Sequence, residues 1–379
     1  MSGGMELYLH MPFCVRKCAY CDFLSFPSGA ETQRMYAKRL MEDIDVMGKR
    51  YGEIPVETIF IGGGTPSVPD SGLIVEIMEH VRHAFHVADG AEISMEANPG
   101  TVTREKLTDY RKAGINRLSF GLQSANDREL KLLGRIHTWA EFLESFTLAR
   151  KCGFANLNID LMSALPGQTC ESWKETLSRV TDLDPEHISA YSLIIEEGTP
   201  FGERYGSEEG RKLLPDEDSE REMYHETKRF LKDCGYERYE ISNYAKPGRE
   251  CRHNIGYWTG VPYLGLGLGA SSYLDGCRFT VNPDMKQYLE EKPGMFADIE
   301  KLTKKDMEEE FFYVGLRMTA GVSLSEFERR FGISAKEVYP GLMETFVKEK
   351  AARFEGDRFV LTDYGLDVSN YIMAQFLQD

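Results

Sequence analysis

The chain has 379 residues, of which 42% are hydrophobic, and its 45 basic and 61 acidic side chains give a formal charge of −16. Such an acidic surface repels phosphate backbones, so we expect no nucleic acid partner. The chain does not open with a basic segment followed by an apolar run, and no apolar stretch reaches the roughly 18–20 residues that cross a bilayer. We therefore expect a cytoplasmic protein with no membrane span.

The first half of the chain alternates short β-rich runs with amphipathic segments of helical length. This alternation predicts parallel β/α units with right-handed crossovers, and six strands in about 190 residues suit an α/β fold of the partial (β/α)6 barrel type. In such folds the chemistry lies at the C-terminal ends of the strands. The predicted strands are Glu6–His10, Thr58–Gly62, Glu92–Glu96, Arg117–Leu122, Asn156–Met162 and His187–Leu193.

The second half changes character twice. We predict a helix over Ser219–Cys234 and a strand over Tyr236–Tyr244, followed by a segment rich in glycine and tyrosine. After about residue 303, three helices, with Ser323 as the cap of one, and a hairpin over Arg353–Leu361 predict a small winged-helix-like α+β domain. The expected domains are a barrel over residues 1–200, a barrel extension over 201–300 and a C-terminal domain over 301–379.

Three of the eight cysteines lie within eight residues, directly after the first predicted strand. Cys14, Cys18 and Cys21 have the spacing C-x3-C-x2-C. A structural zinc site usually takes four ligands in two separated pairs, and no second pair lies nearby; His10 falls inside a predicted strand. Three thiolates leave one iron of a [4Fe–4S] cluster open for a ligand. The triplet therefore favours an iron–sulfur cluster over zinc.

With that spacing the chain resembles the radical-SAM superfamily. The segment from Tyr8 to Cys14, YLHMPFC, resembles a narrower group, the oxygen-independent coproporphyrinogen III oxidases and their relatives, the HemW heme chaperones. The resemblance implies a radical-SAM barrel that binds a [4Fe–4S] cluster and S-adenosylmethionine (SAM). It also implies reductive cleavage of SAM to methionine and a 5′-deoxyadenosyl radical, with an electron donor such as a flavodoxin or ferredoxin.

The segment GGGTP after the second predicted strand lets a ligand approach the backbone closely, because glycine has no Cβ. A phosphate-binding loop is disfavoured, since no Lys-Ser/Thr pair follows and Pro66 lacks a backbone donor. A plain βα turn is the other alternative. Carboxylates suit the ammonium and ribose diol of SAM, and arginine suits its carboxylate. By resemblance, the cofactor-binding residues are Tyr8, Tyr20, Gly63, Gly64, Thr65, Glu96, Gln123, Arg135 and Asp160.

Two features distinguish the chaperones from the oxidases. The oxidases carry a further cysteine two residues after the third, where this chain has Phe23, and a sizeable segment before the cluster, where this chain has 13 residues. Both differences count against oxidative decarboxylation of coproporphyrinogen.

The segment from His253 to Trp258, HNIGYW, resembles the heme-binding motif of the chaperones. Imidazole is a good axial ligand of heme iron, and Tyr257 and Trp258 have rings that can stack on a porphyrin. A histidine that only supports a loop is the alternative, and Cys251 is a second candidate ligand. The catalytic residues stay unknown.

The sequence as a whole predicts a heme chaperone that binds a [4Fe–4S] cluster, SAM and heme, and passes heme to an unknown acceptor protein. The alternatives are an oxygen-independent coproporphyrinogen III oxidase and a radical-SAM methyltransferase that degrades heme.

Overall fold

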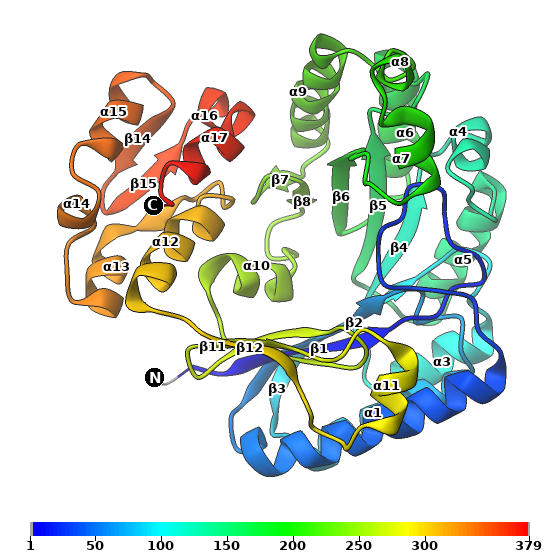
Figure 1. Ribbon diagram of the computed structural model, residues 1–379. Helices are drawn as coiled ribbons and strands as arrows, with labels where there is room; N and C mark the ends of the chain where they lie inside the picture. Colours follow the sequence, from blue (N-terminus) through cyan, green and yellow to red (C-terminus); the bar gives the residue numbers. More distant parts are fainter. Residues whose placement is uncertain (1–2, 378–379) are drawn as a thin grey trace.

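The computed structural model describes residues 3–377, and most of its strands belong to one curved twelve-stranded sheet (Figure 1). Six parallel strands form its centre in sequence order, with antiparallel or parallel additions on both sides. This order confirms the predicted β/α alternation. The six strands are β1 (Met5–Met11), β2 (Val56–Gly63), β3 (Val87–Ala97), β4 (Arg117–Gln123), β5 (Leu157–Ser163) and β6 (His187–Ser192).

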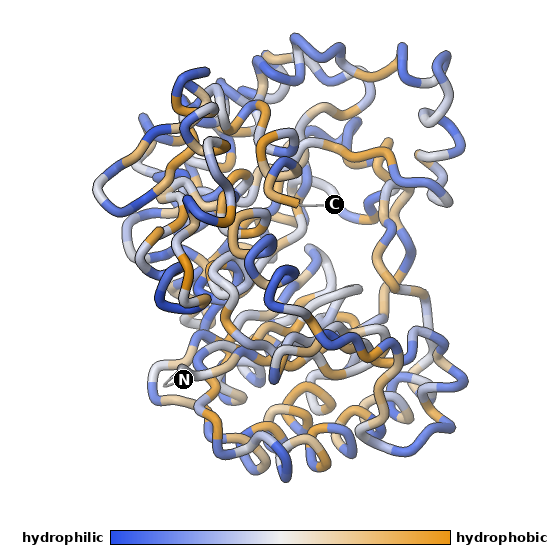
Figure 2. The backbone as a smooth tube through the Cα atoms, turned by 60° about the vertical axis from the view of Figure 1, so that its left-hand side comes forward, coloured by the Kyte–Doolittle hydropathy of each residue, from blue (hydrophilic) through white to orange (hydrophobic). Residues whose placement is uncertain are grey.

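Helices between these strands cover the convex side of the sheet (Figure 1). Figure 2 shows hydrophobic and hydrophilic residues alternating along the helices at its base, as expected of helices with one face on a core. The helices of this half are α1 (Ala30–Tyr51), α2 (Ser71–Ala84), α3 (Arg104–Lys112), α4 (Asp127–Leu132), α5 (Trp139–Lys151) and α6 (Cys170–Thr181).

The two faces of the central strands differ in chemistry. On β1, Met5, Leu7 and Leu9 lie in the core beneath the helices, whereas Glu6 and His10 are buried on the opposite, concave side. The same alternation on the neighbouring strands follows from the two-residue period of a β-strand. The concave side is therefore a largely buried polar surface. Its buried side chains include Thr58, Glu92, Arg117, Asn158 and His187, and its partly buried ones include Glu96 and Asp160.

The segment 200–301 extends the sheet at both edges, and the core continues into it as far as Tyr288. The predicted strand over Tyr236–Tyr244 is wrong as a single strand: two short antiparallel strands flank a turn in which Glu240 is fully buried. The elements are α7 (Pro200–Tyr205), α8 (Glu208–Arg211), α9 (Glu217–Asp233), β7 (Glu237–Arg238), β8 (Asn243–Ala245), α10 (Arg252–Thr259), β9 (Tyr263–Leu266), β10 (Ser271–Leu274), β11 (Cys277–Thr280), α11 (Met285–Glu290) and β12 (Ala297–Lys301).

The last part of the chain has a hydrophobic core of its own, centred on Phe312, Phe327 and Phe376. The predicted cap is confirmed, because the Ser323 side chain accepts a hydrogen bond from the backbone N–H of Glu326. The predicted hairpin is also confirmed. The elements are α12 (Lys304–Gly315), β13 (Val322–Ser323), α13 (Leu324–Phe331), α14 (Ala335–Val338), α15 (Leu342–Lys348), β14 (Ala352–Glu355), β15 (Arg358–Leu361), α16 (Asp363–Asp367) and α17 (Ser369–Ala374). The three-part division at residues 200 and 300 stays a prediction.

Candidate functional site

The cysteine loop, residues 12–29, follows the C-terminal end of β1 and is held at several points. Cys14 N–H donates to Phe26 O at 3.1 Å, and Phe26 N–H donates to Pro12 O at 2.9 Å. In the middle of the loop, Ala19 N–H donates to Leu133 O at 3.0 Å. The loop thus has a defined path without regular secondary structure.

The three cysteines of the loop are half-buried free thiols. Burial raises the pKa of Cys21, and the neighbouring Cys18 and Cys14 raise it further, which places the three sulfurs within electrostatic reach of one another. Within residues 3–377, no three His, Cys, Asp or Glu side chains are arranged as a preformed metal site. The donor set, three thiols on one loop, fits a three-cysteine iron–sulfur cluster. His10 is engaged elsewhere: Nε2 lies 2.9 Å from Leu24 O, and Nδ1 lies 3.0 Å from the Tyr8 hydroxyl.

The glycine segment after β2 passes directly behind the cysteine loop. Gly64 N–H donates to Met11 O at 2.8 Å, and Thr65 N–H donates to Phe13 O at 2.7 Å. Gly63 has φ +109°, and a Cβ there would lie 2.3 Å from the imidazole of His10. A Cβ on Gly64 would lie 2.8 Å from Phe13 N in the cysteine loop. Glycine is therefore required at position 63 by His10 of β1 and at position 64 by the cysteine loop, whatever else these residues bind.

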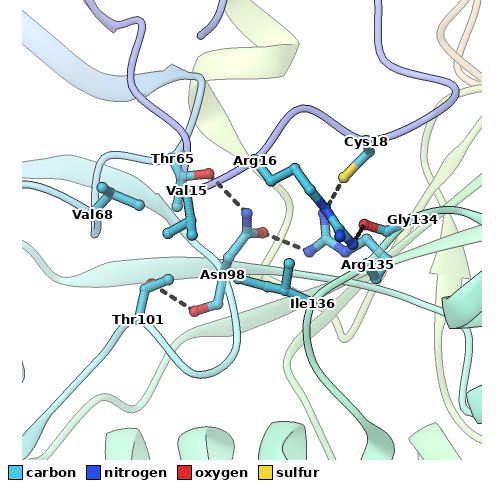
Figure 3. Close-up of a pocket in the computed structure, with 10 residues that line it drawn as sticks. All are labelled: Val15, Arg16, Cys18, Thr65, Val68, Asn98, Thr101, Gly134, Arg135 and Ile136. Atoms are coloured by element: carbon cyan, nitrogen blue, oxygen red, sulfur yellow. Dashed lines mark hydrogen bonds between the residues drawn. The ribbon is translucent and has the colours of Figure 1, made fainter. Parts of the chain in front are cut away.

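A chain of hydrogen bonds joins Cys14 and Cys18 through three side chains, and Figure 3 shows the part of it from Thr65 to Cys18. The Sγ of Cys14 lies 3.5 Å from Thr65 Oγ1, and Asn98 Nδ2 donates to the same oxygen at 2.8 Å. Arg135 Nη2 donates to Asn98 Oδ1 at 2.7 Å, and Arg135 Nη1 lies 3.6 Å from the Sγ of Cys18. Asn98 was not among the predicted site residues, although it stands two positions after Glu96 in the segment that follows β3.

This chain of hydrogen bonds borders a small pocket beside the cysteine loop (Figure 3). Arg135 also donates to Gly121 O, yet its Nε is buried and has no partner within residues 3–377. A buried guanidinium N–H without a partner fits an anionic ligand group such as a carboxylate. The pocket is lined by Val15, Arg16, Cys18, Thr65, Val68, Asn98, Thr101, Gly134, Arg135 and Ile136.

Two predicted carboxylates lie on the concave side of the sheet. Burial raises the pKa of Glu96 to about 8, with the nearby charge of Asp160 as the second cause, while the N–H of Gly63, 3.0 Å away, opposes the shift. Burial also raises the pKa of Asp160, although Asn158 and Ser119 donate hydrogen bonds to it at 2.7 and 3.0 Å. A cationic group placed between the two carboxylates would relieve both the desolvation and the repulsion, so this pair fits the ammonium of SAM.

The remaining predicted SAM residues lie around the same end of the sheet. Tyr20 is partly buried beside Phe201 and close to Arg135, whose charge opposes the rise of the tyrosine's pKa that desolvation causes. Gln123 ends β4 with φ +74°, an uncommon conformation for a residue with a side chain. The structure thus gathers the cysteines and most of the predicted SAM residues at the C-terminal ends of the strands, whereas Tyr8 and Asp160 lie in the middle of β1 and β5.

The predicted heme residues lie elsewhere. His253, Tyr257 and Trp258 belong to α10, and His253 meets Thr58, whose strand neighbour Glu6 is five residues before the end of β1. At about 3.3 Å per residue, this contact is roughly 16 Å from the start of the cysteine loop. The predicted heme motif is therefore at the opposite end of the barrel.

His253 is buried, and both of its ring nitrogens are engaged. Nδ1 lies 2.6 Å from Thr58 Oγ1, Nε2 lies 3.1 Å from the Tyr257 hydroxyl, and the ring stacks on Phe60 with centroids 5.3 Å apart. Burial lowers the pKa of His253 to about 3, and the charge of Arg117 adds to the effect. This arrangement does not fit an axial heme ligand, which needs a ring nitrogen open to the iron. Cys251 is also fully buried, which raises its pKa to about 12.

Comparison with known proteins places these features in a wider context. The Radical SAM superfamily model matches residues 8–180, and the HemN C-terminal domain model matches residues 302–368. The "Heme chaperone HemW" of Bacillus subtilis is 34% identical, with 98% of each chain covered, and that of Escherichia coli K12 is 35% identical over 99% of this chain and 98% of its own.

Among solved structures, coproporphyrinogen III oxidase (HemN) from Escherichia coli has a TM-score of 0.85 at 23% identity. The match covers 99% of this chain and 90% of that one. At this identity the match shows a shared fold. None of the described helices is long and apolar enough to cross a membrane.

Proposed function

This chain belongs to the family of the heme chaperone HemW within the radical SAM superfamily, and we propose on that basis that it binds heme and transfers it to an acceptor protein. The supporting observation is that the similarity to curated heme chaperones runs over almost the whole chain and not over the barrel alone. The proposed setting is the cytoplasm, and the acceptor is a protein that uses heme. The superfamily implies a [4Fe–4S] cluster and SAM as cofactors.

For the cluster, we assign Cys14, Cys18 and Cys21 as the ligands. A bound cluster would supply one electron, received from a donor such as a flavodoxin or ferredoxin, to the sulfonium of SAM. The chain's own part is positional: Thr65 and Arg135 contact the sulfurs of Cys14 and Cys18 and would hold these ligands in place, while the one iron without a cysteine would stay open for SAM.

For SAM, the pocket beside Cys18 and the adjoining concave face offer complementary charges. The free Nε of Arg135 suits the carboxylate of SAM, and Glu96 and Asp160 suit its ammonium and ribose hydroxyls. Gly63, Gly64, Thr65, Gln123, Tyr8 and Tyr20 complete the proposed set. Asn98 joins it, because it links Thr65 to Arg135.

The test of the function is made on anaerobically reconstituted protein. Hemin is added in steps and its Soret band is followed, and in a separate reaction coproporphyrinogen III is supplied with SAM and a reductant. A chaperone gives saturable heme binding at one site per chain and releases no CO2. Formation of protoporphyrinogen would instead identify an oxidase and overturn the proposal.

A further inference from the structure

Both ends of α10 are held, and by different parts of the chain: its first residues enter the barrel, and its last residues contact the C-terminal domain, residues 302–377. We infer that α10 is the joint between this domain and the N-terminal end of the barrel, and that His253 is a positioning residue of this joint instead of a ligand of heme iron. The inference that His253 is not a heme ligand rests on the proposed function, whereas the inference that α10 is a joint does not.

The start of α10 is held by the barrel. Cys251 precedes it and provides no side-chain cap. The buried carboxylate of Glu92 on β3 takes this place: it accepts hydrogen bonds from the N–H of Arg252 at 3.2 Å and of His253 at 3.4 Å, and from the thiol of Cys251 at 3.5 Å. A carboxylate at a helix N-terminus satisfies free N–H groups and the helix dipole together. The barrel thus supplies the cap of α10 from a strand about 160 residues earlier.

One face of α10 packs closely against β1 and β2. His253 contacts Thr58 on β2 through Nδ1 and Tyr257, one turn later, through Nε2, so the imidazole links the sheet to its own helix. Gly256 lies over Glu6 so closely that a Cβ would be 1.9 Å from Glu6 Oε1. The contact between α10 and β1–β2 therefore leaves no room for a larger ligand group. Movement of His253 away from Thr58 would break this contact.

Glu6 and His253 are both neutral at neutral pH. Burial raises the pKa of Glu6 to about 8 and lowers that of His253 to about 3, so the 3.9 Å approach of Glu6 Oε2 to His253 Nδ1 is not an ion pair. The other groups near the imidazole are Thr58, Tyr257 and the charged Arg117. The contact is therefore a buried, uncharged hydrogen-bond network, as expected of a structural anchor.

The end of α10 contacts two arginines of the C-terminal domain. The guanidinium of Arg317, which follows α12, lies 4.3 Å from the ring centroid of Trp258, and it also pairs with the fully buried Glu240 at 3.4 Å. Arg330 on α13 donates to Thr259 O at 3.2 Å. Figure 1 shows α10 lying between the sheet and the C-terminal domain. Trp258 and Thr259 therefore contact the C-terminal domain, while His253 at the other end of the helix contacts the barrel.

The test compares His253→Gln and Glu92→Gln, with His80→Gln on the surface of α2 as the matched control, in the full-length protein. We call these two the anchor variants, because each weakens a contact that holds α10 to the barrel, and Glu92→Gln does so without changing the imidazole. Amide hydrogen exchange is measured over residues 304–331, and hemin is titrated in parallel. We expect both anchor variants to raise exchange in this segment about fivefold or more over the control. The hemin dissociation constant and the Soret maximum should not distinguish His253→Gln from Glu92→Gln.

A Soret band that is lost or shifted in His253→Gln and kept in Glu92→Gln would make His253 a heme ligand and overturn its assignment as a positioning residue. Unchanged exchange in both anchor variants would overturn the joint. Trp258→Phe tests the other end if an anchor variant fails to fold, because Nε1 of Trp258 has no hydrogen-bond partner within residues 3–377 that the change would remove; raised exchange supports the joint, and unchanged exchange overturns it. If the unmodified protein binds no hemin, the proposed function fails while the exchange data still decide the joint.

Discussion

Asn98 donates a hydrogen bond to Thr65 at 2.8 Å, and this contact connects the loops that follow β2 and β3. Through its oxygen the same amide accepts from Arg135, so one side chain holds a neutral and a charged neighbour of the cysteine loop at once. Hydrogen bonds to charged groups contribute more than neutral ones, and a partner left buried without its bond is destabilised.

We therefore expect Asn98→Ala to weaken SAM binding about tenfold, because Arg135 would lose its orientation toward the pocket. Equilibrium dialysis with the reconstituted protein measures the affinity. Asn126→Ala, which removes the helix-capping amide of α4, is the matched control and should leave SAM affinity within about twofold. Equal affinities in the Asn98 and Asn126 variants would contradict the role given to Asn98.

Replacement of each loop cysteine by serine should abolish the cluster. We expect Cys14→Ser, Cys18→Ser and Cys21→Ser to reduce iron from about four atoms per chain to well below one, because a serine hydroxyl is a poor ligand for this iron. Iron and sulfide analysis after reconstitution, with the visible absorption of the cluster, measures the loss. Cys234→Ser, at an exposed position after α9, should keep full iron content; equal loss in that variant would point to nonspecific binding.

The sequence was sufficient for the parallel β/α units of the barrel, because short β-rich runs alternate along the chain with amphipathic segments of helical length. It was not sufficient for the surroundings of His253. Thr58 is 195 positions away along the chain, and only the sheet brings the two together. The heme expectation rested on the resemblance of this segment to a family motif, which says nothing of whether a ring nitrogen is free. Asn98 could have been found, since it shares a short segment with Glu96 at the end of a strand.

The two short strands β7 and β8 illustrate a different limit. The run Tyr236–Tyr244 has strand-like composition, yet Glu240 in its middle turns inward to meet Arg317 of the C-terminal domain. A buried carboxylate needs a partner, and here that partner is an arginine 77 positions away along the chain. No property of the nine residues alone reveals that partner.

Glu6 should make the stability of the protein depend on pH. Its pKa is raised by burial from 4.5 to about 8, so its neutral form is favoured in the folded state. The stability that Glu6 contributes is fully present below pH 4.5 and is lost as the pH rises through 8. The carboxyl group then ionises in a buried position of the folded state, which is unfavourable. Glu6→Gln should therefore be more stable than the unmodified protein at pH 9, by about 2–5 °C in melting temperature, and this advantage should disappear near pH 5.

Thermal unfolding of both proteins from pH 5 to 9 tests this dependence, with Glu79→Gln on an exposed face of α2 as the control. The control should follow the unmodified protein across the whole range. A constant difference between Glu6→Gln and the unmodified protein at every pH would show that Glu6 does not titrate in this window.

Gly63 offers a test of how the ends of β1 and β2 fit together at the site. Alanine at this position would meet two obstacles, the positive φ of +109° and the imidazole of His10 at 2.3 Å. Gly153 has a similar φ of +87°, but an added Cβ there meets no described atom within 4 Å. Gly153→Ala therefore measures the backbone strain alone, about 1–2 kcal/mol of unfolding free energy.

We expect Gly63→Ala to cost about 2 kcal/mol more than Gly153→Ala, since His10 would have to leave Leu24 O and the Tyr8 hydroxyl to make room. Because His10 also supports the cysteine loop through Leu24, the variant should retain less iron after reconstitution, whereas Gly153→Ala should retain all of it. Denaturant unfolding and iron analysis measure the two effects. If both alanine variants lose the same stability, the contact with His10 is not what requires glycine at this position.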